Sequence, residues 1–91
     1  MPRKRDRLDI IEDMLSAIQT KGGEIKPTHL MYKSNLSYGQ MQSYLEELIS
    51  KELIKKISRE NNDYIIITDR GHEFVNKLKE MKEFETSFGL R

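Results

Sequence analysis

The side chains best suited to chemistry lie between residues 37 and 43. This segment contains five uncharged side chains that can form hydrogen bonds: Ser37, Tyr38, Gln40, Gln42 and Ser43. Glutamine can pair bidentately with adenine, and serine and tyrosine hydroxyls reach phosphates or bases. Gly39 would let the backbone approach a duplex closely. The pattern therefore predicts contact with double-stranded DNA, and its alternative is an ordinary solvated helix face.

Cationic side chains form a second candidate group on either side of this segment. The members are Arg3, Lys4 and Arg5 near the start, Lys33 before the segment, and Lys55, Lys56 and Arg59 after it. The formal net charge is only +1, so DNA binding would need a local basic surface. We expect these cations to contact phosphates. The alternatives are a solubilising tail at the start and edge-strand lysines that discourage strand pairing.

Catalytic and metal-binding patterns are not found in the sequence. Cysteine is absent, and His29 and His72 stand alone without ligands at metal-binding spacing. No Ser/His/Asp set, paired carboxylates or glycine-rich phosphate loop stands out. We therefore expect a protein that is not an enzyme and has no cofactor, no metal and no small-molecule substrate.

The candidate contact segment lies on a predicted helix that follows a tight turn. Apolar residues at helical spacing predict a first helix over residues 8–20, which ends at Gly22-Gly23. Ile25 predicts a strand of one or two residues, and Pro27 suits the first turn of a short second helix. Asn35 can adopt a left-handed conformation, and Leu36 can plug the turn. Ser37 is a good N-cap for a third helix, so residues 37–51 form the expected recognition helix.

A change of period after the third helix predicts a β-hairpin. Branched and aromatic residues flank a polar Asn-Asn-Asp turn within residues 54–67. Thr68 then suits the N-cap of a last helix that continues towards Phe88. The order helix, helix, tight turn, helix and hairpin is typical of a winged helix-turn-helix.

Two segments of the sequence resemble a known family. Residues 31–38 (Met-Tyr-Lys-Ser-Asn-Leu-Ser-Tyr) and residues 64–74 resemble archaeal winged-helix transcriptional regulators. The second segment includes the Thr-x-x-Gly-x-x-Phe start of the last helix. The similarity includes the small ten-kilodalton DNA-binding proteins of Sulfolobus and runs from about residue 5 to residue 81. It implies a winged-helix fold, DNA binding, and dimerisation through the last helix as an antiparallel coiled coil.

The last helix carries an apolar stripe that is the expected dimer interface. Its members are Phe74, Leu78, Met81, Phe84 and Phe88. Phe74 and Leu78 would serve a helix that packs on its own domain, whereas the other three extend beyond what a small domain covers. The last helix is expected to be too short to form a long coiled coil. The alternatives are a shorter helix pair or a frayed C-terminal end.

Taken together, these patterns predict a mainly α (α+β) protein with a three-helix core, a two-stranded wing and a C-terminal dimerisation helix. We expect a basic arm over residues 1–7, the winged domain over 8–70 and the dimerisation helix over 71–91. The expected function is double-stranded DNA binding by a cytoplasmic, nucleoid-associated homodimer without membrane contact, in transcriptional regulation or chromatin organisation. The alternative is a winged-helix adaptor that binds protein. A small-ligand sensor is disfavoured because few polar residues fall at core positions.

Overall fold

The computed structural model describes residues 4–89, and its first helix, α1, spans Arg7–Thr20. Asp6 caps this helix through reciprocal hydrogen bonds with Asp9, in which each carboxylate accepts from the other residue's backbone N–H at 2.8 and 3.1 Å. Gly22 and Gly23 follow the helix with φ of +82° and +94°. The predicted helix and its glycine terminus are therefore confirmed, with one residue added at the start.

The helix-turn-helix forms as the sequence predicts. Strand β1 is Glu24–Ile25, helix α2 is Pro27–Ser34, and helix α3 is Tyr38–Ser50. Asn35 ends α2 in the left-handed conformation (φ +53°), and Leu36 is 8% exposed within the turn. The Ser37 hydroxyl accepts from the N–H of Gln40, while the Gln40 side chain accepts from the N–H of Ser37. This reciprocal cap fixes the direction in which α3 leaves the turn.

The hairpin is longer, and its turn tighter, than the sequence suggested. Strand β2 spans Ile54–Arg59 and strand β3 spans Asn62–Ile67, joined by Glu60 and Asn61, which both have positive φ. Positive φ at both central residues is the geometry of a type I′ hairpin turn. Asn62 therefore lies in a strand and not at the tip. Because β1 pairs with β3, the sheet has three strands in the order β1-β3-β2, which leaves one edge of β2 free.

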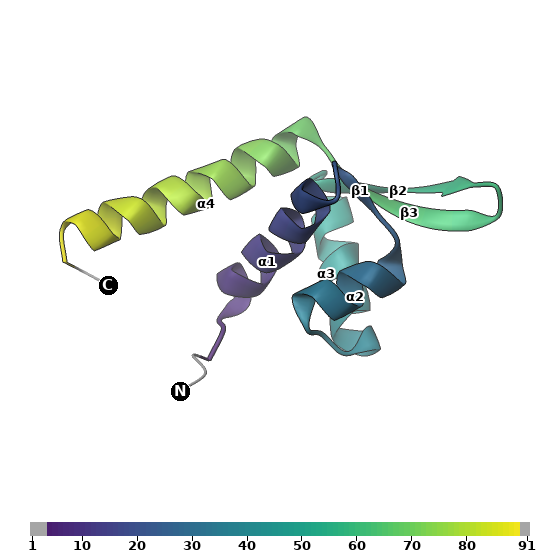
Figure 1. Cartoon of the computed structure of the whole chain (residues 1–91), viewed down its shortest axis with the longest axis horizontal. Helices are drawn as coiled ribbons and strands as arrows, with labels where there is room; N and C mark the ends of the chain where they lie inside the picture. Colours follow the sequence, from purple (N-terminus) through teal and green to yellow (C-terminus); the bar gives the residue numbers. More distant parts are fainter. Residues whose placement is uncertain (1–3, 90–91) are drawn as a thin grey trace.

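Helix α4 spans Asp69–Ser87, so the last helix continues towards Phe88 as the sequence predicts. It is the longest helix in residues 4–89, begins at the Thr68 cap, and extends away from the body on the side opposite the wing (Figure 1). The first three helices, the sheet and the start of α4 enclose one core that includes Met14, Leu30, Leu48, Ile65 and Val75. The structure confirms the predicted winged-helix architecture and gives it a projecting arm. The division of the chain at residue 71 stays a prediction, since α4 itself begins at Asp69.

An ionic cluster attaches α4 to α1 where the arm leaves the body. The ammonium of Lys82 donates to Asp9 at 3.0 Å and to Glu12. Asp9 is only 7% exposed and also completes the cap of α1. Hydrogen bonding to Glu12, and then to Asp9, raises the pKa of Lys82 above its usual 10.5. The cluster therefore holds the middle of α4 against the start of α1.

Replacing Lys82 by methionine should destabilise the fold by about 1–2 kcal/mol, because two partly buried carboxylates lose their cation. Urea unfolding near pH 8 measures the effect, and Lys79→Met is the matched control because Lys79 is exposed. The folded state favours the charged Lys82, so its contribution is complete below pH 10.5 and is lost as the pH rises through the raised pKa. A stability gap between wild type and Lys82→Met that is unchanged well above pH 10.5 would contradict this account.

Candidate nucleic-acid interface

The amino-terminal half of α3 presents the predicted polar segment to solvent. The helix buries Met41, Leu45 and Leu48 in the core, so the opposite side faces outward. Tyr38 is 66% exposed, and Ser37, Gln40 and Ser43 are also exposed. Gln42 is half-buried at the flank of this face. The side-chain amide oxygen of Gln40 accepts the hydrogen bond that caps the helix. Tyr38, Gln42 and Ser43 therefore form the part of the surface free for recognition.

Carboxylates on α3 begin only after this segment. Glu46 is exposed one turn beyond Gln42, and Glu47 forms an ion pair with Arg7 at the start of α1. Residues 38–43 themselves carry no charge. The surface that would enter a groove is therefore neutral at its tip, and phosphate repulsion begins only towards its carboxyl end.

Arg5 of the predicted basic arm contacts the helix-turn-helix, where it has a structural role in place of the predicted phosphate contact. The Arg5 guanidinium donates to the carbonyls of Ser34 (2.7 Å) and Asn35 (3.1 Å) and pairs with Asp13 at 2.9 Å. These contacts satisfy carbonyls at the end of α2, so Arg5 stabilises the turn and has little capacity left for phosphate. Lys4 is exposed beside it, and Arg3 lies outside the described residues.

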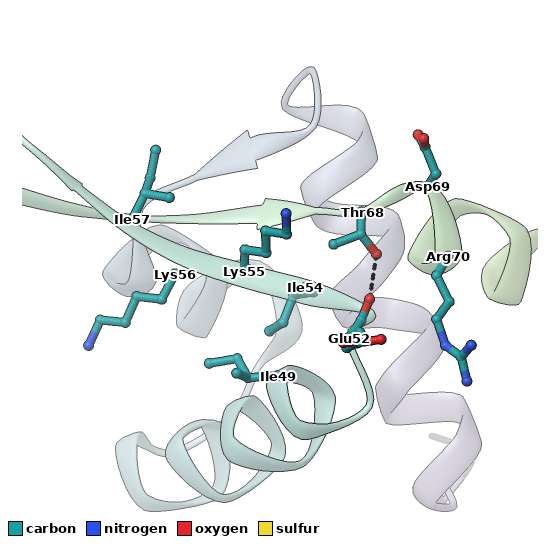
Figure 2. Close-up of a pocket in the computed structure, with 9 residues that line it drawn as sticks. All are labelled: Ile49, Glu52, Ile54, Lys55, Lys56, Ile57, Thr68, Asp69 and Arg70. Atoms are coloured by element: carbon teal, nitrogen blue, oxygen red, sulfur yellow. Dashed lines mark hydrogen bonds between the residues drawn. The ribbon is translucent and has the colours of Figure 1, made fainter.

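The wing places its cations on opposite faces of the sheet. Lys55 and Arg59 share one face, where Arg59 lies 4.8 Å over the Tyr64 ring and pairs with Glu24. Lys56 points to the face that bears α3, as Figure 2 shows. Lys56 thus lies on the side of the recognition helix, and Lys33 is exposed on the last turn of α2, which precedes the turn into that helix.

Lys56 shares its face of the wing with an ionised carboxylate. Its ammonium lies 3.6 Å from Asp63, which also accepts a 2.7 Å hydrogen bond from the Ser58 hydroxyl. The Ser58 bond, and then the charge of Lys56, lower the pKa of Asp63. Both partners of the pair are about half exposed, so solvent weakens their attraction and leaves Lys56 able to turn towards a phosphate.

A groove of about 660 Å³ runs along the free edge of β2 between α3 and the start of α4 (Figure 2). Ile49 is an apolar residue of α3 that is 38% exposed at this groove. The lining residues are Ile49, Glu52, Ile54, Lys55, Lys56, Ile57, Thr68, Asp69 and Arg70. The groove continues the α3 face onto the wing, so a duplex seated on α3 would meet β2 next.

Tyr32 is an exposed aromatic side chain that the sequence analysis missed. It is 74% exposed on α2, directly before Lys33. The signal was present in the spacing: Leu30 and Ser34 mark the buried side of α2, and a residue two positions from Leu30 lies on the opposite side of a helix. Its hydroxyl adds an exposed hydrogen-bonding group to α2, the helix that precedes the turn into α3.

The apolar stripe of α4 divides into a buried part and an exposed part. Leu78 is 6% exposed and Phe74 is half-buried against the core, so both belong mainly to the packing of the single chain. Met81, Phe84 and Phe88 are 45%, 62% and 68% exposed, and the Phe84 and Phe88 rings lie 4.8 Å apart. These three side chains form an apolar surface on the projecting arm, which we call the arm stripe.

Within residues 4–89, no cluster of three or more histidine or acidic side chains has the geometry to hold a metal ion. No helix in the same range is both long and apolar enough to cross a bilayer.

The sequence is similar to known sequences over nearly its whole length. The profile of the winged helix-turn-helix family matches residues 4–86. An uncharacterized protein of Methanocaldococcus jannaschii, MJ0290, is 31% identical over 78 residues, which cover 86% of this chain and 34% of that protein. A second, MJ0287, is 32% identical over 84 residues, 92% of this chain and 80% of that protein. The chain thus spans about a third of the first relative and most of the second.

A solved structure shows the same fold at low sequence identity. Sso10a-2, a DNA-binding protein from Sulfolobus solfataricus, superposes with a TM-score of 0.74 over 93% of this chain and 90% of that chain, at 18% identity. The predicted resemblance to the small Sulfolobus proteins is therefore confirmed at the level of fold.

Proposed function

Because this chain belongs to the winged helix-turn-helix family, we propose that it binds double-stranded DNA without catalytic activity, as a transcriptional regulator or chromatin-associated protein. In this proposal α3 enters the major groove, and the wing formed by β2 and β3 contacts flanking phosphates. The observation that carries it is the exposed, uncharged amino-terminal half of α3. Tyr38 and Ser43 stand clear of the protein there, and Gln42 lies at their flank.

The proposed phosphate contacts are few. Lys56 lies on the α3 side, Lys33 lies on the last turn of α2, Lys4 lies beside the turn, and Lys55 and Arg59 lie on the outer face of the wing. Arg59 is already paired with Glu24, so we assign it a smaller share. A small number of phosphate contacts predicts modest affinity for random duplex and a moderate salt dependence. Base contacts from α3 would then supply much of any preference for one sequence.

Two copies of the chain are proposed to associate through the arm stripe. Exposed apolar side chains that the monomer does not cover tend to mark interfaces, and helix pairs bury such stripes well. The arm projects from the side opposite the wing, so pairing through it leaves α3 of each copy accessible (Figure 1). A dimer of this kind would contact two stretches of duplex at once.

Adjacent lysines on opposite faces of β2 provide a direct test of the proposed orientation. Lys56→Ala should weaken binding to all duplexes and reduce the slope of log K against log salt by about 1, because one phosphate contact is lost. Lys55→Ala should have the smaller effect, since Lys55 faces away from α3. Fluorescence anisotropy with a random duplex pool at about 50 and about 200 mM salt measures both slopes.

Replacement of Gln42 tests the recognition helix. Gln42→Ala should cost about 1–3 kcal/mol on preferred duplexes selected from a random pool and little on other sequences. A loss equal for all sequences would instead assign Gln42 to the backbone. If wild type shows neither salt-dependent binding nor a selected sequence, the DNA proposal fails and the adaptor alternative stands.

A further inference from the structure

A second pocket, which shares Arg70 with the β2 groove, joins the end of the recognition helix to the start of the arm. Its volume is about 330 Å³, and its lining is Lys51, Leu53, Arg70, Glu73, Phe74 and Lys77. Lys51 is the C-cap of α3, whereas the last four lie in the first turns of α4. The pocket is at the lower end of the size range of small-ligand sites. It is separate from the arm stripe, which occupies the last turns of α4.

The pocket has an apolar floor and a cationic rim. Leu53 is 4% exposed and Phe74 is half-buried, so their side chains form a fixed apolar surface. Three cations and one carboxylate surround it, which gives the lining a net charge of +2 in a chain whose total is only +1. The lining of this pocket is therefore more positive than residues 38–43 of α3, which carry no charge.

The rim cations are largely unpaired. Within the described part of the chain, no carboxylate lies within ion-pair distance of Lys51 or Arg70, although Glu73 shares the pocket. Lys77 has Glu80 at 3.6 Å, but both side chains are about 70% exposed, so this pair is weak. Arg70 lines both the β2 groove and this pocket, and Figure 2 shows its guanidinium extending away from β2.

We propose that this pocket binds a small organic carboxylate with a flat apolar body. The body would lie on Phe74 and Leu53, and the carboxylate would take paired hydrogen bonds from Arg70 and the charge of Lys51 and Lys77. A neutral apolar molecule would leave the cations without a partner, and inorganic phosphate would leave the apolar floor exposed. The combination of rim and floor therefore selects for molecules that carry both features.

Occupation of the pocket would join two parts of the molecule. A carboxylate between Lys51 and Arg70 links the end of α3 to α4, so ligand binding would stiffen the junction between the reading helix and the arm. If the chain binds DNA as proposed, the ligand would act as an effector that alters DNA affinity; the binding itself does not rest on that proposal.

Titration of the full chain with benzoate, followed by backbone amide NMR, tests the site. We expect saturable shifts of the Lys51, Leu53 and Glu73 amides, with benzamide and inorganic phosphate each binding at least about tenfold more weakly. Arg70→Gln should weaken benzoate binding by about tenfold or more, whereas Lys79→Gln, which removes a similar charge outside the pocket, should not. Arg70→Lys should fall between them, because it keeps the charge without the paired geometry.

The outcomes separate this site from the DNA proposal. Equal affinity for benzoate and benzamide, benzoate shifts at other amides, or the absence of shifts would overturn the site. Equal affinity for phosphate would overturn the apolar-bodied class of ligand. If benzoate binds but the chain does not bind duplex in the anisotropy assay, the site stands and the DNA function is rejected. If the chain binds duplex but benzoate causes no shifts, the DNA function stands and the site is rejected.

Discussion

Replacing Gly71 by alanine should destabilise the protein by about 3 kcal/mol, the upper part of the range for overpacked sites. An ideal Cβ at this position would lie less than 3.0 Å from the Leu53 carbonyl oxygen and 2.7 Å from Cγ1 of Ile67. The carbonyl is fixed because it accepts a 3.1 Å hydrogen bond from the N–H of Thr68. Gly71 in turn donates to the Thr68 hydroxyl at 3.0 Å. The added methyl group therefore has to move backbone, and not the end of a flexible side chain.

Thermal and urea unfolding measure this effect. For a domain of this size, about 3 kcal/mol corresponds to a fall in Tm of roughly 10–20 °C. Gly39→Ala is the matched control, because a Cβ on Gly39 meets nothing within 4 Å. It should leave stability unchanged or raise it by up to about 1 kcal/mol, since alanine favours helix over glycine. Equal stabilities for the two variants would show that the Leu53 carbonyl can move and that the tight contact is not required.

Local capping and turn signals account for the parts of the fold that the sequence predicted well. The caps at Ser37, Asn35 and Thr68 each involve a backbone group three or four residues away, so the residue type alone identifies the helix end. The Gly71 contact is different. The Thr-x-x-Gly pattern was visible as a family resemblance, but its physical reason, a carbonyl 18 positions earlier in the chain, required the folded structure.

The candidate site was predicted less completely because its geometry depends on tertiary contacts. The alternation of strand residues already requires Lys55 and Lys56 to lie on opposite faces, yet only the packing of α3 decides which face matters. Arg5 was read as part of a basic arm, whereas long-range hydrogen bonds to Ser34 and Asn35 give it a structural role. The pocket at Arg70 escaped prediction because its cations lie at exposed positions, which no search for polar core residues would select.

Introducing a charge into the arm stripe should separate the proposed dimer and produce the largest functional loss. In Phe84→Glu, a carboxylate replaces a ring that is 62% exposed in the single chain and packed against Phe88. Monomer stability should therefore change little, while an apolar helix pair would have to bury an unpaired charge. Sedimentation equilibrium should show a dimer for wild type and a monomer for the variant. Affinity for a duplex with two sites should fall about 100-fold or more, because the second contact is no longer linked to the first.

Asn76→Glu is the matched control for this experiment, since Asn76 is exposed on α4 and the change adds the same charge away from the stripe. It should remain dimeric and keep its affinity for duplex. Binding to a duplex with a single site should be similar for Phe84→Glu and wild type, because the reading surface on α3 is distant from the arm stripe.

A wild type that is monomeric at concentrations where it binds DNA would reject the arm stripe as an interface. A dimer that survives Phe84→Glu would place the interface elsewhere. If Phe84→Glu loses the same affinity for single-site and two-site duplexes, α4 affects DNA binding through the fold of one chain and not by linking two copies.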